Sequence, residues 1–195
     1  VALTVVNGAV NIKIENVTGD IAITAVTQQL EQNNLLINGS FILGTQFWTF
    51  VQDHFKLEEA GGSDALNDPA YIHSAGKDGG VLSQAFGVEK DTNYELSFRY
   101  KGSVPQDAAL WAIGSKNTFT WNSVIYKASV ADAGDWTTVT VVFNSSNYTS
   151  LDLLFRTEDG ADYGLDNIWI TKTDKEATVT LYKRPVLGAR PNPSP

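Results

Sequence analysis

Short runs of alternating apolar and polar residues recur along most of the chain. The alternation is clear in Tyr94-Glu-Leu-Ser-Phe98, and it predicts a strand that buries one face. Turn signals rich in Gly, Pro and Asp separate the runs, for example at residues 61–62, 68–69 and 159–160. No long stretch places apolar residues at helical spacing. The pattern therefore predicts an all-β protein with many short strands.

The predicted strands of the central part have the number and spacing of a β-sandwich. They are residues 35–37, 47–50, 54–58, 71–74, 80–86, 93–102, 108–113, 124–129, 136–144, 150–157 and 166–171. In the strand 93–102 we expect Leu96, Phe98 and Tyr100 to face the core. Arg99 then faces the other way.

The two ends of the chain differ from this central part. Residues 1–30 predict three short strands, and residues 8–25 resemble the ends of Ig-like repeats in bacterial surface and phage tail proteins. We therefore expect residues 1–30 to be a partial Ig-like module or a docked β segment, and residues 31–173 to form the main domain. Residues 174–195 predict one more strand at 177–183 and a Pro-rich tail. The chain has no Met, so we expect Val1 to be a processing or fragment boundary.

Composition and charge narrow the function. The chain is 43% hydrophobic and 11% aromatic but only 18% charged, which suits short strands around a real core. Its net charge of −8 disfavours nucleic acid as a partner. It has no Cys, and no run of 18 apolar residues predicts a membrane span.

Three ordered stretches carry a family resemblance. The opening is Asn34-Leu-Leu-Ile-Asn-Gly-Ser-Phe41 followed by Trp48, the middle joins residues 80–84 and 94–98, and the close joins residues 136–140 and 165–170. Together they resemble the jelly-roll carbohydrate-binding modules of families four, nine, sixteen and twenty-two. The resemblance implies a two-sheet jelly roll that holds a polysaccharide or cell-surface glycan against an attached enzyme or a cell surface. It also implies an extracellular, cell-surface or virion-surface location.

The resemblance further implies a structural calcium ion, with one departure. The family has Glu directly after the opening Phe as a calcium ligand, whereas this chain has Ile42. The late Asp of the family is kept as Asp166, and Asp159 and Asp162 in the preceding loop could add oxygen ligands. The alternative is that Asp166 only accepts hydrogen bonds from turn amides.

A sugar ring stacks on exposed aromatic faces, and planar polar side chains bind its hydroxyls. Residues of these types outside the predicted core are the candidate carbohydrate ligands, and core or edge packing is the alternative for each of them. They are Arg99, Trp111, Trp121, Tyr126 and Gln84. Three other Trp residues differ. We expect Trp48 and Trp136 to be structural core residues, and Trp169 to face outward under the N-terminal segment or a neighbouring chain.

The chain shows little sign of catalytic chemistry. It has two His residues, and no nucleophile elbow, phosphate loop or His-rich metal motif appears. Glu58 and Glu59 are adjacent, so on a strand they face opposite sides and cannot flank one glycosidic bond. We expect a non-catalytic module. A structural or adhesion module of a phage tail, baseplate or capsid surface without a sugar site is one alternative, and an accessory module of a secreted glycoside hydrolase is another.

Overall fold

The computed structural model describes residues 33–50, 53–64, 69–74, 76–105, 110–115 and 124–179. The chain divides into two compact units, Val1–Gln32 and Asn33–Pro195, and every described residue belongs to the second. The strands predicted within residues 1–30 and the Pro-rich tail lie outside the described residues. Within the described ranges, no helix has the length and apolar character needed to cross a membrane.

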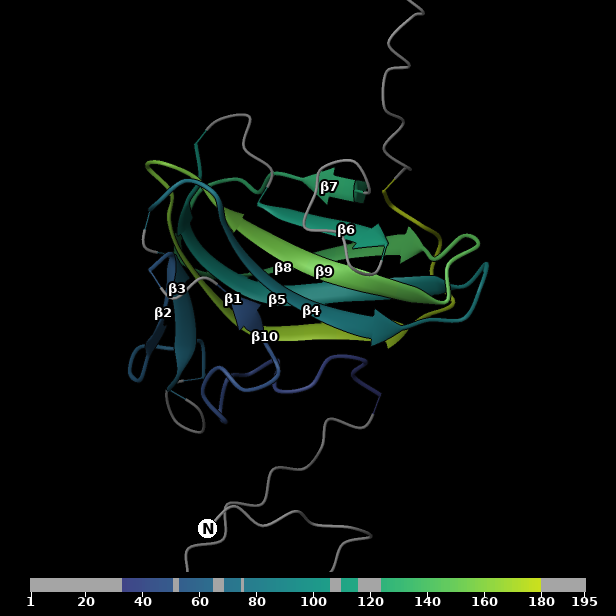
Figure 1. The fold of residues 1–195 in the computed structure, drawn as a ribbon, viewed down its shortest axis with the longest axis horizontal. Coiled ribbons are helices and arrows are strands. Elements are labelled where there is room, and N and C mark those ends of the chain that lie inside the picture. Colours follow the sequence, from purple (N-terminus) through teal and green to yellow (C-terminus); the bar gives the residue numbers. More distant parts are fainter. Residues whose placement is uncertain are drawn as a thin grey trace, which may run out of the picture. The chain divides into compact units, whose positions relative to one another are not determined.

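Two five-stranded antiparallel sheets form the second unit (Figure 1). The first sheet has the order β1-β4-β9-β6-β7, with bounds β1 Thr49–Phe50, β4 Gly80–Gly87, β9 Ser150–Thr157, β6 Trp111–Ser115 and β7 Val124–Ala128. The second has the order β2-β3-β10-β5-β8, with bounds β2 Phe55–Glu58, β3 Tyr71–Ser74, β10 Asp162–Lys172, β5 Asn93–Ser103 and β8 Ala133–Asn144. Chain order crosses repeatedly between the sheets, and the predicted jelly-roll β-sandwich is confirmed.

The hydrophobic core fills the space between the two sheets. Leu96, Phe98 and Tyr100 are fully buried on β5, as the alternation predicts. Phe98 meets Phe155 of the opposite sheet edge to face, with ring centroids 5.1 Å apart. Such a pair adds about 1 kcal/mol beyond the area it buries. The aromatic residues of the sequence therefore lie mostly where the two sheets meet.

The segment 34–48 is not a strand where residues 35–37 predict one. It runs in turns along β10, held by the backbone bonds from the Leu35 amide to the Ile170 carbonyl and from the Ile168 amide to the Gly39 carbonyl, and by side-chain amides. The Asn34 carboxamide donates to the Ile168 carbonyl at 3.0 Å and accepts from the Ile170 amide at 2.9 Å. Gly39 packs so closely here that a Cβ atom on it would lie 2.0 Å from the Ile168 oxygen. The Asn and Gly positions of the opening motif thus fix this segment against the second sheet.

A β-bulge in β10 changes which side chains face the core. The register with β5 shifts between Asp166 and Trp169, and Asn167 takes a left-handed φ of 47°. Asp166 pairs with Arg99 on the outer side of the sheet, although strict alternation predicts it on the inner side with Ile168. The Ser63 amide donates a hydrogen bond to the Asp166 carboxylate. Asp166 is therefore buried without being a core residue.

The described tryptophans only partly follow the prediction. Trp48 is a core residue as expected, and its indole N–H donates to the Asn38 carbonyl at 2.9 Å. Trp136 is not a core residue: it is half-buried on the outer side of β8, where it packs on Tyr71. Trp169 is half-buried opposite Ser97 on the outer face, and the N-terminal cover expected for it lies outside the described residues.

The chain beyond β10 returns to the edge of β8. Thr178 exchanges hydrogen bonds with the backbone of Val142, and its hydroxyl accepts from the Val142 amide at 2.9 Å. Residues 177–179 are not a strand by themselves, and the rest of the strand predicted at 177–183 lies outside the described residues. This contact protects one edge of the second sheet from pairing with another chain.

Candidate functional site

The first-sheet hollow is a surface cavity of about 400 Å³ on the outer side of β1, β4 and β9. It is lined by Ile37, Phe47, Thr49, Ser83, Gln84, Ala85 and Asp152. The segment 34–48 supplies its apolar wall, and strands β4 and β9 supply its floor. It is therefore built from a rigid sheet and from a segment whose backbone is fixed by side-chain amides.

The apolar wall consists of two exposed hydrophobic side chains. Phe47 is 57% exposed and Ile37 is 49% exposed, and both line the hollow. Phe47 also has a φ of 72°, a left-handed conformation that costs about 1 kcal/mol for a residue with a Cβ atom. An exposed aromatic ring held at this cost is typical of a residue kept for contact with a partner.

Gln84 fixes the position of this wall. Its carbonyl oxygen accepts the Ile37 amide at 2.6 Å, and its amide nitrogen donates to the Ile37 carbonyl at 2.9 Å. The side chain therefore imitates a neighbouring strand. Because both hydrogen bonds come from one buried amide, the backbone of Ile37 is fixed relative to β4.

The floor of the hollow is polar and carries one carboxylate. Asp152 lies opposite Ala85 in the β4–β9 register, with Ser83 two residues earlier on β4. Thr49 of β1 faces Ser83 across the next pair of strands. Hydroxyls can donate and accept, and an ionised carboxylate accepts at about four sites. The floor thus offers polar groups to a ligand, with Thr49 exposed and with Ser83 and Asp152 mostly buried.

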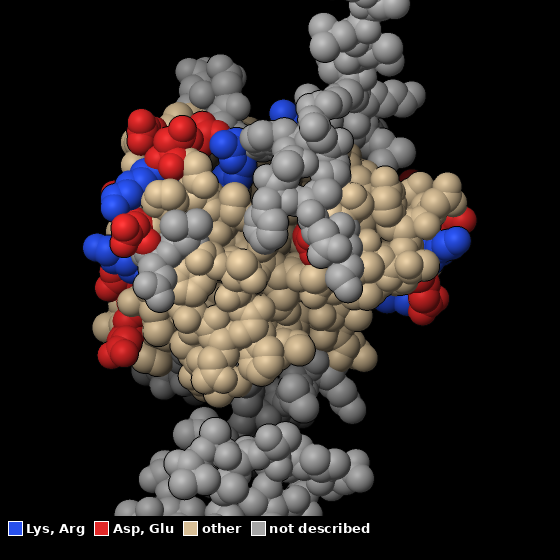
Figure 2. All heavy atoms as spheres, viewed as in Figure 1, with Lys and Arg blue, Asp and Glu red and all other residues tan. Residues whose placement is uncertain are grey.

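The face around the hollow is mostly uncharged. In Figure 2 the Lys, Arg, Asp and Glu side chains gather at the margins of the view, many of them on the side of β2 and β3, whereas the lower middle of the visible described surface is tan. A neutral ligand can approach this area without displacing strongly hydrated charges.

Trp111 and Tyr126 do not present exposed rings, so this part of the prediction is wrong. Trp111 is 1% exposed and Tyr126 is 3% exposed. Ile113 pairs with Tyr126 on the inner side of the sheet, and Ala112 pairs with Lys127 on the outer side. The run Leu110–Ile113 is apolar on both faces, so alternation alone could not decide which side faces the core.

The other candidate carbohydrate ligands are scattered. Arg99 lies on the outer face of the second sheet, where its guanidinium donates to the Thr138 hydroxyl at 3.0 Å and to the Trp136 carbonyl at 3.1 Å. Gln84 lines the first-sheet hollow, but both ends of its amide are bonded to Ile37. Trp121 lies outside the described residues. The structure thus brings only Gln84 to the hollow.

The three aspartates proposed for calcium do not converge. Asp166 accepts the amides of Ser63 and Asn167, both at 2.7 Å. Asp162 accepts from His73 at 2.8 Å, and Asp159 accepts the Asp78 amide at 3.1 Å. Within the described ranges, no three His, Cys, Asp or Glu side chains are placed to hold a metal ion. With Ile42 in place of the family Glu, this donor set does not fit a calcium ion.

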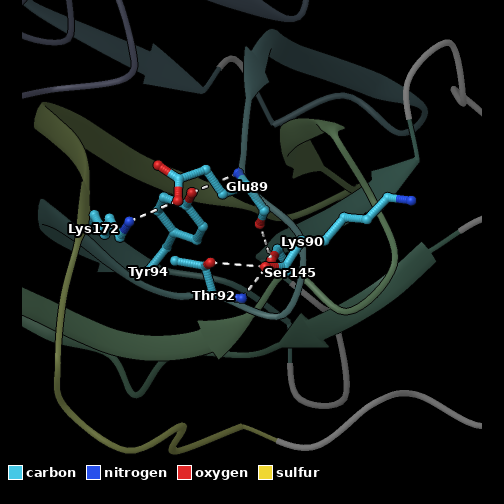
Figure 3. Close-up of polar contacts among 6 residues, drawn as sticks. All are labelled: Glu89, Lys90, Thr92, Tyr94, Ser145 and Lys172. Carbon is cyan, nitrogen blue, oxygen red and sulfur yellow. Dashed lines mark hydrogen bonds and ion pairs between the residues drawn. The ribbon is translucent and has the colours of Figure 1, made fainter.

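A dense polar network elsewhere is structural (Figure 3). The Ser145 hydroxyl donates to the Glu89 carbonyl and accepts the Thr92 amide at 3.0 Å. The Tyr94 hydroxyl accepts the Glu89 amide at 2.8 Å, and the Glu89 carboxylate pairs with Lys172 at 2.7 Å. These bonds fix the turn between β4 and β5, and we assign no ligand to them.

A match to a protein-family model shows which family the domain belongs to. The model of the carbohydrate-binding domain family CBM_4_9 matches residues 33–162. The chain belongs to this family. The two-sheet fold of residues 33–162 is therefore that of a carbohydrate-binding domain. No curated protein sequence matches the chain.

Solved structures share the fold of this carbohydrate-binding domain. One, titled "CBM4 structure and function", has 19% identity and a TM-score of 0.52, with 71% of this chain and 99% of that chain covered. A CBM61 module in complex with β-1,4-galactotriose has 18% identity and a TM-score of 0.52, with 72% and 99% covered. The enzymatically active domain of bacteriophage CBA120 tailspike protein 4 has 15% identity and a TM-score of 0.55, with 72% and 21% covered. The chain thus spans about a fifth of that tailspike chain.

Sequence reasoning missed Phe47 and Ile37. The run Phe47–Phe50 predicts a strand, which hides the exposed ring inside an apolar run. The left-handed φ of Phe47 takes this residue out of the strand, so the alternation of an extended chain does not place its ring.

Proposed function

We propose that this carbohydrate-binding domain binds a neutral polysaccharide or cell-surface glycan in the first-sheet hollow, without catalysing a reaction. The observation that carries the proposal is the exposed ring of Phe47 above a polar floor. The apolar ring suits the C–H face of a pyranose, and the hydroxyls and carboxylate of the floor suit its hydroxyl groups. A shallow, preformed site of this kind supports affinities of about millimolar to micromolar.

The proposal extends to the parent protein. We propose that the domain is part of a larger extracellular or virion-surface protein, which it holds against a glycan. The fold similarity to part of a phage tailspike and to modules named for carbohydrate binding supports this context. A calcium ion has no part in the proposal, because the three aspartates each have other bonding partners.

Calorimetric titration of the full chain with a panel of neutral oligosaccharides and polysaccharides tests the proposal. Phe47→Ala is expected to weaken binding at least about tenfold, which corresponds to ~1.4 kcal/mol. Leu43→Ala is the matched control, because Leu43 is 41% exposed on the same segment but does not line the hollow. It should leave the affinity unchanged.

Two results would overturn the proposal. Equal weakening by both variants would mean that the segment 34–48 contributes only nonspecific hydrophobic contact. A folded chain that binds none of the panel would favour the alternative, a structural or adhesion module without a sugar site.

A further inference from the structure

The second-sheet hollow is a cavity of about 310 Å³ on the outer side of the opposite sheet. It lies where β3, β5, β8 and β10 come together, with His73, Lys101, Gly134 and Asp162 among its lining residues. The hydrophobic core separates it from the first-sheet hollow. A ligand in one hollow therefore cannot touch the other.

Glycines form the floor of this hollow and allow aromatic rings to approach it. A Cβ atom on Gly164 would lie 3.0 Å from the rings of both Trp136 and Tyr71. Gly102 has a φ of 108°, and a Cβ atom there would lie 2.1 Å from the Asp162 carbonyl oxygen. Gly102 therefore needs glycine, whereas a Cβ atom on Gly164 would require the two rings to shift by a few tenths of an ångström.

The wall of the hollow is rigid before any ligand arrives. Tyr71 lines the hollow, and Trp136, which does not line it, meets Tyr71 edge to face with centroids 5.4 Å apart. The Lys101 ammonium lies 4.4 Å from the Tyr71 centroid and 4.6 Å from the Trp136 centroid. Lys101 and the Trp136 indole both donate to the Gly61 carbonyl, at 3.2 and 3.0 Å. A wall held by these contacts loses little conformational entropy on binding.

The other side of the hollow offers hydrogen-bonding groups. His73 Nε2 lies 2.8 Å from the Asp162 carboxylate, and His73 Nδ1 lies 3.9 Å from Glu58. The Asp162 side chain is 81% exposed, so its carboxylate can accept further donors. Burial, followed by the charges of Glu58 and Asp162, raises the pKa of Tyr71, which keeps its hydroxyl a donor at neutral pH.

We propose that the second-sheet hollow is a second binding site for a neutral pyranose residue of a glycan. A fixed aromatic wall beside a carboxylate–imidazole pair matches the apolar face and the adjacent hydroxyls of such a ring. The Asp162 carboxylate lines the hollow and the Glu58 carboxylate lies 3.9 Å from His73, whereas Lys101 is engaged with two rings and a carbonyl. Uronic acids and phosphates are therefore disfavoured. The choice of a sugar rests on the proposed function, but the site does not depend on the first-sheet hollow.

Nuclear magnetic resonance titration of the full-chain Phe47→Ala variant tests the second site alone. The neutral probes are β-1,4-galactotriose, xylohexaose, cellohexaose and mannohexaose, and the acidic probe is trigalacturonic acid. We expect a neutral probe to shift the Trp136 indole N–H and the Gly102 and Gly134 amides. Trp136→Phe assigns the indole resonance.

A pair of variants at one position provides the control. A Cβ atom on Gly134 meets nothing within 4 Å, so both substitutions fit the fold. Gly134→Gln fills the hollow and should weaken this binding at least about tenfold, whereas Gly134→Ala should change it less than about threefold.

The outcomes separate this inference from the proposed function. If the Phe47→Ala variant shows no shifts while the unmodified chain binds a probe, the second site is refuted and the first stands. If Gly134→Gln removes binding that Phe47→Ala leaves intact, the second site stands, and the first is refuted only if Phe47→Ala also leaves the total affinity of the chain unchanged. A preference for trigalacturonic acid would overturn the ligand class, and a folded chain that binds no probe would overturn both sites.

Discussion

Gln84 and Ile37, far apart in the sequence, are joined by two hydrogen bonds between one side-chain amide and one backbone residue, at 2.6 and 2.9 Å. The pair ties the segment 34–48 to the first sheet. It also fixes the backbone of Ile37, whose side chain lines the first-sheet hollow. The first prediction concerns this contact.

Gln84→Leu should destabilise the fold by about 1–2 kcal/mol, because it removes both partners of the Ile37 backbone groups. It should also weaken glycan binding, since Ile37 and Phe47 are no longer held over the floor. Urea unfolding and calorimetric titration measure the two effects, and exchange of the Ile37 amide should become faster. An unchanged exchange rate would show that the amide does not fix the segment.

Phe47→Gly and Phe47→Ala should separate strain from binding. The φ of 72° suits glycine, so the Gly variant should be more stable than the Ala variant by about 1 kcal/mol. Both lack the ring and should lose glycan binding equally. Urea unfolding gives the stabilities, and a less stable Gly variant would show that the left-handed conformation costs nothing here.

Stability should fall as the pH rises above 10. Burial, with a smaller contribution from Asp132, raises the pKa of Tyr100 to about 12, and burial also raises the pKa of Tyr163. The folded state therefore keeps protons that the unfolded state loses from pH 10 upward. The stabilisation that the two protonated tyrosines give the folded state is fully present below pH 10. It is lost as the pH rises through their pKa values in the folded state, by at most about 1.4 kcal/mol per pH unit for each group.

Tyr100→Phe provides the control for the alkaline effect. The buried Tyr100 hydroxyl makes no hydrogen bond within the described part of the chain. The variant should be as stable as the parent or more stable at pH 7, by up to about 1 kcal/mol. It should also lose less stability between pH 10 and pH 12. Chemical unfolding across this range measures both, and an identical pH profile would contradict the assignment to Tyr100.

Asp166→Asn should lower the free energy of unfolding by about 2 kcal/mol, because the buried carboxylate accepts hydrogen bonds from two backbone amides at 2.7 Å.

Calcium chelation should leave the melting temperature of the parent chain unchanged, since Asp159 and Asp162 do not join Asp166. Thermal unfolding with and without a chelator measures this. A fall of several degrees on chelation would show that a calcium ion contributes to the fold.

The strand pattern could be predicted from the sequence because most strands alternate on one buried face. The strands at 71–74 and 150–157 have the predicted bounds, and the inner set of β5 is correct. Two kinds of feature could not be predicted in this way. The bulge at Asp166 reverses the side on which alternation places it. Residues 35–37 form turns in which one backbone bond, from the Leu35 amide to the Ile170 carbonyl, is supplemented by the Asn34 side chain.

The candidate site was harder to predict, because exposure in a sandwich depends on long-range neighbours. Trp111 lies in a run that is apolar on both sides, so the inner face could not be chosen from composition. Trp136 follows a polar turn, and its packing partner Tyr71 comes from a distant strand. The exposed ring of Phe47 depends on a left-handed backbone that an apolar run does not reveal.

The segment 34–48 is bonded to both sheets, and this has a mechanical consequence. Asn34 is bound to the backbone of β10, and Ile37 is bound to Gln84 of β4. Tension applied through the chain before Asn33 would therefore reach the two sheets through neighbouring anchors, and neither sheet would carry it alone. A load on the chain at Asn33 is thus divided between two hydrogen-bonded anchors, one on each sheet.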